Sequence, residues 1–417
     1  MATQPNLLET TSGWLAMEAL RLLTNPLEVL PLFNTDYQEN LEMEFPINKT
    51  FDVPLPDNFL IRNGLAYSPQ SIIDRHTTIT CDQVFGVDVE WDSIEAALQM
   101  PRGETRVKKK LAGAMRKIQQ EWDSRAANFA MLNTPNIVGI LGTNPTTFDS
   151  IYGAADQRLT ELAGNYGDKT MILSPGMARS LRGGAVSYFN PTDEIARMFK
   201  KGYIGEVTGF GQSYQSMSLY QTTADTWAGA VTTNAANQSG SSLVLVATTG
   251  DTFTPGTSFT IAGVNDVNPM TLRATGPKNF MVDVSPVVAA GSAATIFIAP
   301  AIVGPGSPYQ NVDALPGASA ALTMYPGTVA PNGKVGINGL ALGKDAFAFV
   351  GIKLQNPKPS SEEIVAQEQD PDTSVSIAFI RSFDVPSRKW VNRWDTAGGF
   401  GRLWFDHCAV RVLGGAN

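Results

Sequence analysis

A chain of 417 residues is long enough for roughly two to three domains. It is 43% hydrophobic and 17% charged, and the hydrophobic content is typical of a folded protein. Its formal net charge of −8 excludes the strong basic excess of a dedicated nucleic-acid-binding protein. No apolar run reaches the roughly 20 residues of a membrane span, and the first residues lack the pattern of a signal peptide, so we expect a protein that does not cross a membrane.

The first sixty residues combine one helix with a long extended segment. The predicted helix covers 11–24, and its apolar face is formed by Trp14, Met17, Ala19, Leu22 and Leu23. Residues 25–62 are punctuated by prolines and show no helical period, so this segment has no core of its own. We expect it to lie across a neighbour. The pair Asn63-Gly64 then predicts a tight turn.

A strand and a very long helix come next. Apolar residues recur among polar ones at 70–91 and predict the strand. Residues 104–133 carry the clearest helical pattern, with apolar residues three or four positions apart at Val107, Leu111, Met115, Ile118, Trp122, Ala126 and Phe129. At 1.5 Å per residue this helix would be about 40–45 Å long, enough to cross a whole domain.

Six basic residues lie in the first half of this helix: Arg106, Lys108, Lys109, Lys110, Arg116 and Lys117. We interpret them as a solvated helix face. The alternative is a basic surface that faces nucleic acid or an acidic neighbour. Positive charge near a helix N-terminus opposes the helix dipole, so these residues need partners outside the helix.

An α/β pattern follows and is interrupted by a β module at 222–340. The α/β part before the module has predicted strands at 136–141 and 170–173. Its predicted helices are 147–163, 175–181, which is closed by Gly183-Gly184, and 191–202. The module is poor in charge, and its predicted strands are 243–246, 258–262, 280–284 and 295–298. After it, strands are predicted at 346–352, 374–380 and 403–413, and a polar, exposed loop at 358–371.

Catalytic and metal-binding patterns are absent from the sequence. The only histidines are His76 and His407, and no Cys/His spacing fits zinc. His407 lies between Asp406 and Cys408, but on a strand such neighbours point to opposite faces, so we expect no catalytic cluster. The glycine-rich run at 164–170 fails as a phosphate loop, because Asp168 precedes the lysine and the predicted order is helix, loop, strand.

Two further features have structural readings that we prefer. Trp390 and Trp394 alternate with basic residues at 388–394, a pattern also found in proteins that bind single-stranded nucleic acid. They would share one face of a strand, so core or subunit packing is favoured.

Two cysteines, Cys81 and Cys408, are too few for a disulfide framework and indicate a reducing compartment. We therefore predict no enzyme, no catalytic or metal site and no cofactor.

An ordered set of short matches resembles the major coat proteins of short-tailed phages of the Salmonella-phage type. The most extensive is the run GTSFTIAGV at 256–264, which resembles the inserted domain of that family. The others lie at 18–23, 53–56, Phe59, Arg62, Asn63, Gly64, 267–269, 307–312, 344–348 and 380–384. The set extends over nearly the whole chain.

The resemblance implies the α+β capsid fold of tailed phages and herpesviruses, of the Hong Kong ninety-seven type, with an inserted antiparallel β-barrel. The parts it implies, in chain order, are an N-terminal arm at 1–40, an extended loop at 41–75, a peripheral domain with a spine helix at 76–135, an axial domain at 136–222, the barrel at 223–340, and the rest of the axial domain with returning peripheral strands at 341–417.

The function implied by the resemblance is assembly. The chain would form hexamers and pentamers of an icosahedral shell around double-stranded DNA, which it would touch without specificity on the inside. A scaffolding protein and a portal protein would be its partners, and assembly would take place in the host cytoplasm. The alternative from another class is a β-rich adhesin or ligand-binding structural protein.

Overall fold

The computed structural model describes residues 7–24, 27–38, 50–55, 58–61, 64–65, 69–71, 74–91, 103–164, 168–185, 209–354, 364–370, 373–384 and 389–415. The chain divides into two compact units, each built from three separate segments. Unit 1 consists of Met1–Leu55, His76–Ala126 and Phe347–Arg402. Unit 2 consists of Pro56–Arg75, Ala127–Ala346 and Leu403–Asn417.

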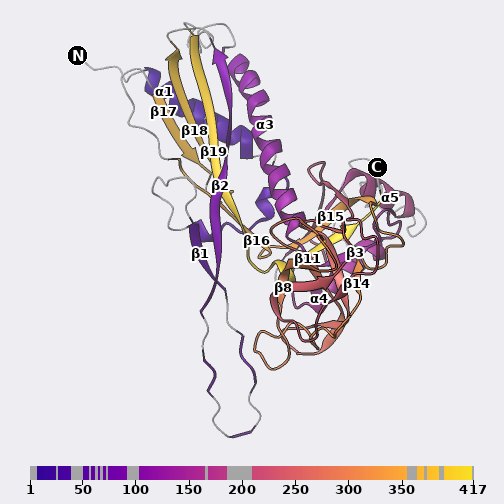
Figure 1. The fold of residues 1–417 in the computed structure, drawn as a ribbon. Helices are drawn as coiled ribbons and strands as arrows, with labels where there is room; N and C mark the ends of the chain where they lie inside the picture. Colours follow the sequence, from indigo (N-terminus) through magenta and orange to yellow (C-terminus); the bar gives the residue numbers. More distant parts are fainter. Residues whose placement is uncertain are drawn as a thin grey trace. The chain divides into compact units, whose positions relative to one another are not determined.

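Unit 1 is an antiparallel sheet with long strands, seen beside helix α3 in Figure 1. The strands in spatial order are β1 (Thr50–Leu55), β2 (Arg75–Trp91), β19 (Lys389–Arg402), β18 (Ser376–Asp384) and β17 (Ile364–Gln369). A sixth strand, β16 (Phe347–Gly351), pairs with the second half of β19. Segments from both ends of the sequence thus meet in one sheet, with Trp394 opposite Val87.

The core of unit 1 is arranged around one tryptophan on α3 (Gly103–Leu132). Trp122 is fully buried, and its ring lies 4.7 Å from that of Phe85, 5.1 Å from Phe349 and 5.9 Å from Phe400. Its indole N–H donates a hydrogen bond of 3.1 Å to the hydroxyl of Thr396. A buried indole needs such a partner, so this contact fixes how the helix is rotated against the sheet.

The N-terminal segment is attached to α3 by Asp123. Its carboxylate accepts hydrogen bonds from three successive backbone N–H groups, those of Glu28 at 3.1 Å, Val29 at 3.0 Å and Leu30 at 3.2 Å. Burial raises the pKa of Asp123, and the three N–H groups oppose that shift by stabilising the charged form. The three donors lie at the start of the short helix η1 (Leu30–Leu32): Leu30 is its first residue, Val29 is its N-cap and Glu28 precedes it. Backbone N–H groups at a helix start have no helical acceptor.

This attachment corrects one expectation for the segment after the first helix. Leu27, Val29, Leu30 and Phe33 are buried inside unit 1, so this part packs on its own chain. The first helix is α1 (Leu7–Thr24), which packs on β17 and β18. Its buried face is formed by Leu15, Ala16, Ala19 and Leu23, whereas Met17, expected on the apolar face, is exposed.

We expect Asp123→Asn to lower the free energy of unfolding by about 1–3 kcal/mol, because all three backbone donors lose a charged acceptor and one of them faces an NH₂ group in place of an oxygen. Urea unfolding followed by tryptophan fluorescence measures the change. Glu121→Gln is the matched control on the same helix, since Glu121 makes only an exposed ion pair with Arg125. It should cost less than about 1 kcal/mol. Equal losses in the two variants would show that Asp123 is not an anchor.

Unit 2 contains a second sheet, which is flanked by helices. Its strands in spatial order are β3 (Ile137–Gly139), β20 (Ala409–Leu413), β15 (Val335–Gly343), β4 (Lys169–Leu173) and β5 (Gln212–Gln215). The pairs β3–β20 and β4–β5 are parallel, and β15 is antiparallel to both of its neighbours. The π-helical turn η3 (Asp149–Gly153), α4 (Ala154–Glu161) and α5 (Pro175–Ala185) supply Tyr152, Leu159 and Met177 to its core. We call this the host sheet.

The rest of unit 2 is a six-stranded antiparallel β-barrel. Its strands in spatial order are β14 (Leu322–Met324), β10 (Ser258–Val267), β11 (Ala274–Val282), β13 (Ala294–Ile302), β8 (Gly240–Val246) and β7 (Thr232–Thr233). The ring closes between its two ends, where Thr232 pairs with Ala321 and Leu322 N–H donates 2.9 Å to the carbonyl of Val231. A small pair, β9 (Thr252–Phe253) and β12 (Val287–Val288), lies outside this ring.

The barrel leaves and rejoins the host sheet through one antiparallel pair of strands. Strand β6 (Gln221–Thr223) pairs with the start of β15, with Thr223 opposite Val335 and Gln221 opposite Ile337. The remainder of β15 pairs with β4 and β20. One strand therefore belongs to the entrance of the barrel at one end and to the host sheet at the other.

The α+β class and the inserted antiparallel barrel predicted from the sequence are confirmed. Three element predictions need correction. The helix predicted at 175–181 continues through Gly183 and Gly184, the loop predicted at 358–371 contains β17, and the strand predicted at 403–413 contains the helical turn α7 (Phe405–Cys408) before β20. The helix predicted at 191–202 lies outside the described residues.

Candidate functional site

The three neighbouring residues that resembled a catalytic cluster lie in the helical turn α7. His407 lies on α7, with Nε2 3.5 Å from Asp406 Oδ2, so the argument that neighbours on a strand diverge was wrong for this pair. The third member, Cys408, is buried, and burial raises the pKa of its thiol to about 12. A thiol with that pKa is protonated at neutral pH and does not act as a nucleophile.

The glycine-rich run at 164–170 has the order helix, loop, strand, as predicted, because α4 precedes it and β4 follows. Lys169 is buried and forms an ion pair with Asp156, so its ammonium is not available for a phosphate. Gly164 is required by close packing, since a Cβ there would stand 1.9 Å from the carbonyl oxygen of His407. Gly164 is therefore part of the close packing around α7.

The aromatic and basic features also have structural roles where they are described. Trp394 is buried and its ring lies 5.2 Å from that of Phe379, so the preferred core reading is confirmed for it. The side chain of Trp390 lies outside the described residues. On α3, the described basic side chains Lys109, Arg116 and Lys117 are exposed, as expected of a solvated face.

Within the described parts of the chain, no group of three or more His, Cys, Asp or Glu side chains is arranged to hold a metal. The described helices also include none that could span a bilayer. Two groups of buried polar side chains converge between the barrel and the host sheet, both parts of unit 2. We call this region the joint and take it as the candidate functional site.

The first part of the joint is a buried ion triad. Asp266, on β10, accepts a hydrogen bond of 2.6 Å from Arg158 of α4 and one of 3.0 Å from Lys278 of β11. Asp266 and Lys278 are fully buried, and Arg158 is nearly so. The guanidinium of Arg158 also lies 3.4 Å from the side-chain oxygen of Asn136, next to β3. The carboxylate thus ties one helix of the host sheet to two strands of the barrel.

The second part of the joint is Arg411, which points from β20 toward the start of β10. Its guanidinium donates hydrogen bonds to the carbonyl oxygen of Gly256 at 2.9 Å, the hydroxyl of Ser258 at 2.6 Å and the carbonyl oxygen of Met131 at 3.3 Å. Tyr325 lies beside it, with the guanidinium carbon 5.9 Å from the ring centre. These contacts join the host sheet, the barrel and the end of α3.

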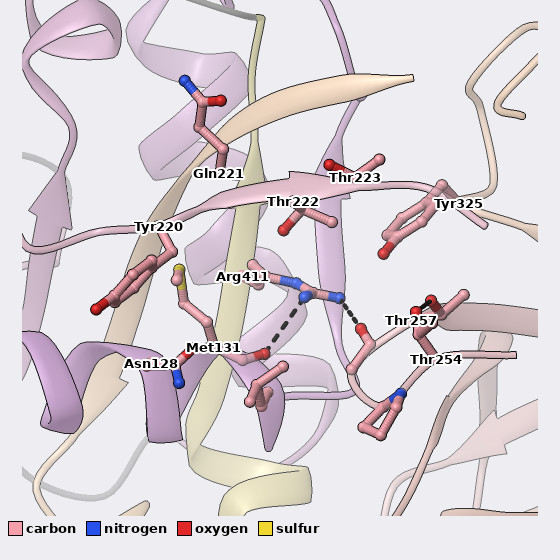
Figure 2. Close-up of a pocket in the computed structure, with 13 residues that line it drawn as sticks. Asn128, Met131, Tyr220, Gln221, Thr222, Thr223, Thr254, Thr257, Tyr325 and Arg411 are labelled. Carbon is pink, nitrogen blue, oxygen red and sulfur yellow. Dashed lines mark hydrogen bonds between the residues drawn. The ribbon is translucent and has the colours of Figure 1, made fainter. Parts of the chain in front are cut away.

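Arg411 and Tyr325 border a cavity of about 120 Å³, shown in Figure 2. Its walls come from the last turn of α3, from β6 and from the loop before β10. The side chains that line it are Asn128, Met131, Leu132, Tyr220, Gln221, Thr222, Thr223, Thr254, Pro255, Thr257, Tyr325 and Arg411. The described lining has no thiol, imidazole or carboxylate, and its polar groups are hydroxyls, amides and the guanidinium of Arg411.

Asp225 fixes the barrel end of the cavity. Its carboxylate accepts hydrogen bonds from the backbone N–H of Thr254 at 2.9 Å and from the hydroxyl of the same residue at 2.7 Å. Burial raises its pKa, and these hydrogen bonds oppose the shift. Asp225 is the second residue after β6, so it connects the first residues of the insertion to the loop that lines the cavity.

Sequence reasoning did not find the joint. Asp266, Arg158, Lys278 and Arg411 are far apart in the sequence, and none belongs to a recognisable motif. Asp266 and Lys278 lie outside the strands predicted at 258–262 and 280–284, and only the longer β10 and β11 of the structure bring these charges into the interior, where buried charges need partners. Their partner Arg158, on the polar side of an amphipathic helix, carried no signal either.

We expect Asp266→Asn to lower the free energy of unfolding by about 3–5 kcal/mol, because two buried cations then lack their shared carboxylate. Lys278→Met is the matched variant at the same site, and it leaves Asp266 paired with Arg158. Its cost should be clearly smaller in urea unfolding monitored by circular dichroism. A larger loss in Lys278→Met than in Asp266→Asn would contradict the central role of the carboxylate.

No protein-family model matches the sequence, and no curated protein matches it either. Solved structures do match, at low identity. A structure from Mycobacterium phage Che8 is 14% identical, with 93% of this chain and 90% of that chain covered and a TM-score of 0.43. The capsid of the cyanophage P-SCSP1u is 12% identical, with 93% of this chain and 87% of that chain covered and a TM-score of 0.41. The capsid of Ralstonia phage GP4 is 8% identical, with 94% of this chain and 88% of that chain covered and a TM-score of 0.42.

Proposed function

We propose that this chain is the major capsid protein of a tailed phage, of the short-tailed Salmonella-phage type, and that it acts by self-assembly. The observation that carries the proposal is that large apolar side chains in the extended segment are exposed in the single chain. Phe59, Ile61 and Leu65 expose 58%, 91% and 98% of their surfaces in the single chain. Exposed apolar side chains gathered in one segment mark a surface for association.

The order of elements along the chain supports the same proposal. An N-terminal helix, an extended segment, a long strand, a helix of 30 residues and a sheet interrupted by a barrel follow one another, and C-terminal strands return to the first sheet. This is the order that the family resemblance implies. The proposed parts remain the arm at 1–40, the extended loop at 41–75 and the peripheral domain at 76–135. The axial domain at 136–222 and 341–417 is then split by the barrel at 223–340.

In the proposed mechanism the extended loop lies on the adjacent subunit and buries Phe59, Ile61 and Leu65 there. The contact joins two different surfaces, so repeated copies close into rings, which would be hexamers and pentamers of an icosahedral shell. A scaffolding protein would direct curvature, a portal protein would occupy one vertex, and double-stranded DNA would fill the interior of the virion. Assembly would take place in the host cytoplasm, and catalysis has no part in this function.

We expect the double substitution Ile61→Asp with Leu65→Asp to abolish shell formation without changing the unfolding free energy of the subunit. Both side chains are already exposed in the single chain, so charge there affects only association. Negative-stain electron microscopy and sedimentation of the purified protein, with and without a scaffolding protein, provide the measurement. Val329→Asp, at a barrel loop residue that is 82% exposed, is the matched control and should assemble normally.

Two outcomes of that experiment would contradict the proposal. Shells formed at normal yield by the double variant would show that the extended loop is not the association surface. Small, monodisperse particles from the unmodified chain under every condition would count against a capsid protein and favour a β-rich adhesin or ligand-binding protein.

Removal of the barrel tests what the insertion contributes. Because Thr223 and Val335 are paired, residues 224–334 can be replaced by Asn-Gly, the preferred two-residue turn between antiparallel strands. We expect the shortened chain to keep the circular-dichroism signal of its remaining sheets but to unfold at a lower temperature and to assemble poorly. Normal shells with unchanged thermal stability would show that the barrel does not brace the subunit.

A further inference from the structure

The first half of α3 carries positive charge with no acidic residue beside it in the sequence. Residues 105–120 contain six basic residues and no acidic one, in a chain whose formal net charge is −8. The described side chains among the six are those of Lys109, Arg116 and Lys117, and all three are exposed. None of them forms an ion pair with a described carboxylate. The second half of the helix differs, because its Arg125 is paired with Glu121.

The three described cations lie on one side of α3. With about 100° of rotation per residue, Lys109, Arg116 and Lys117 fall within an arc of roughly 100°. Met115 and Trp122, which are fully buried, lie on the opposite side of the helix. From Lys109 to Lys117 the arc extends about 12 Å along the helix axis. The cations are therefore presented together, away from the core of unit 1.

Gly113 lies in the middle of this arc and is exposed. A Cβ at this position would meet no atom of the described chain within 4 Å, so packing does not require a glycine. A glycine inside a helix is unfavourable relative to alanine, because it loses more conformational freedom on folding. What it provides is room for another molecule to approach the helix backbone. We call Lys109, Gly113, Arg116 and Lys117 the basic face.

The charge pattern of the basic face favours one class of partner. A helix face that serves only solubility usually mixes charges of both signs. Double-stranded DNA carries about one negative charge per 1.7 Å of its axis, so a length of about 12 Å presents about seven phosphates. Lysine and arginine bind phosphate oxygens through charge-assisted hydrogen bonds. Positive charge in the first turns also opposes the helix dipole, and a bound polyanion removes that conflict.

We propose that the basic face is a contact surface for the phosphate backbone of double-stranded DNA, without sequence specificity. Lys109, Arg116 and Lys117 contact phosphates, and Gly113 is the point at which the duplex comes closest to the helix. The inference rests on the proposed capsid function, in which the packaged genome is the duplex, and it names the surface of the subunit that meets it.

The test is fluorescence anisotropy of a labelled DNA duplex of arbitrary sequence, titrated with the purified, unassembled full-length chain at several sodium chloride concentrations. We expect a Kd of roughly 10⁻⁴–10⁻⁶ M, as is typical of non-specific binding. The triple variant Lys109→Gln, Arg116→Gln, Lys117→Gln removes three phosphate contacts. The slope of log K against log salt concentration should therefore become less steep by about 2–3.

The matched control is the triple variant Arg179→Gln, Arg273→Gln, Lys344→Gln. It changes the net charge by the same amount at exposed positions of unit 2. Its salt slope should stay within about 0.5 of that of the unmodified chain. Equal changes of slope in the two triple variants would mean that only the net charge matters, which overturns the proposal.

Gly113→Leu tests the close approach without changing the charge. The position is open and leucine is a good helix former, so the thermal midpoint of unfolding should not fall. The added side chain should raise the Kd for the duplex several-fold. An unchanged Kd would show that the duplex does not come close to the helix at Gly113, and this also overturns the proposal.

Two results with the unmodified chain would overturn the proposal outright. One is the absence of duplex binding at low salt with up to about 100 μM chain, the middle of the range for non-specific contacts. The other is binding of polyglutamate but not of the duplex, which would assign the basic face to an acidic protein. A chain that forms shells but binds no duplex contradicts only this inference, whereas one that binds the duplex but never assembles contradicts only the capsid function.

Discussion

The organisation of unit 2 depends on the pairing of β6 with the first residues of β15. A barrel inserted into another sheet must begin and end at neighbouring positions of that sheet, or the host strands are forced apart. Here Thr223 and Val335 are direct partners, and Ala224 N–H donates 2.8 Å to the carbonyl of Lys334 just beyond them. The same strand continues between β4 and β20, so the barrel is attached to the most central strand of its host.

A single strand pair would be a hinge, and the buried charges of the joint make it rigid. Asp266 with Arg158 and Lys278 fixes one side, and Arg411 with the loop before β10 fixes the other. Ionic contacts of this kind add little net stability, because desolvation offsets most of the attraction, but they are satisfied in only one geometry. A shell subunit, as proposed here, needs that fixed geometry more than it needs extra stability.

The sequence predicted the elements with strong periodicity and missed what depends on distant partners. Helix α3 and strands β8 and β10 follow from their apolar patterns, and Trp122 lies on the buried face as expected. The turn at 405–408 was predicted as strand because its apolar neighbours continue into β20. Pairing with β18 makes β17 a strand in a segment that composition marked as loop. The packing of Val29 and Leu30 on α3 depends on hydrogen bonds to Asp123, which is distant in the sequence. Arg411 has no local signal at all, because its partners are two backbone oxygens and the hydroxyl of Ser258.

The close spacing of Thr223 and Val335 also bears on how the chain folds. Bringing the two ends of a loop together costs conformational entropy, and this cost rises slowly with the number of residues in the loop. A barrel that folds early holds these two residues together, and from then on it acts on the host sheet as a tight turn would. Once the barrel has folded, the host strands on either side of it are separated by a short effective loop instead of more than a hundred unfolded residues. Contacts with a shorter effective separation form faster, so the interrupted domain folds faster.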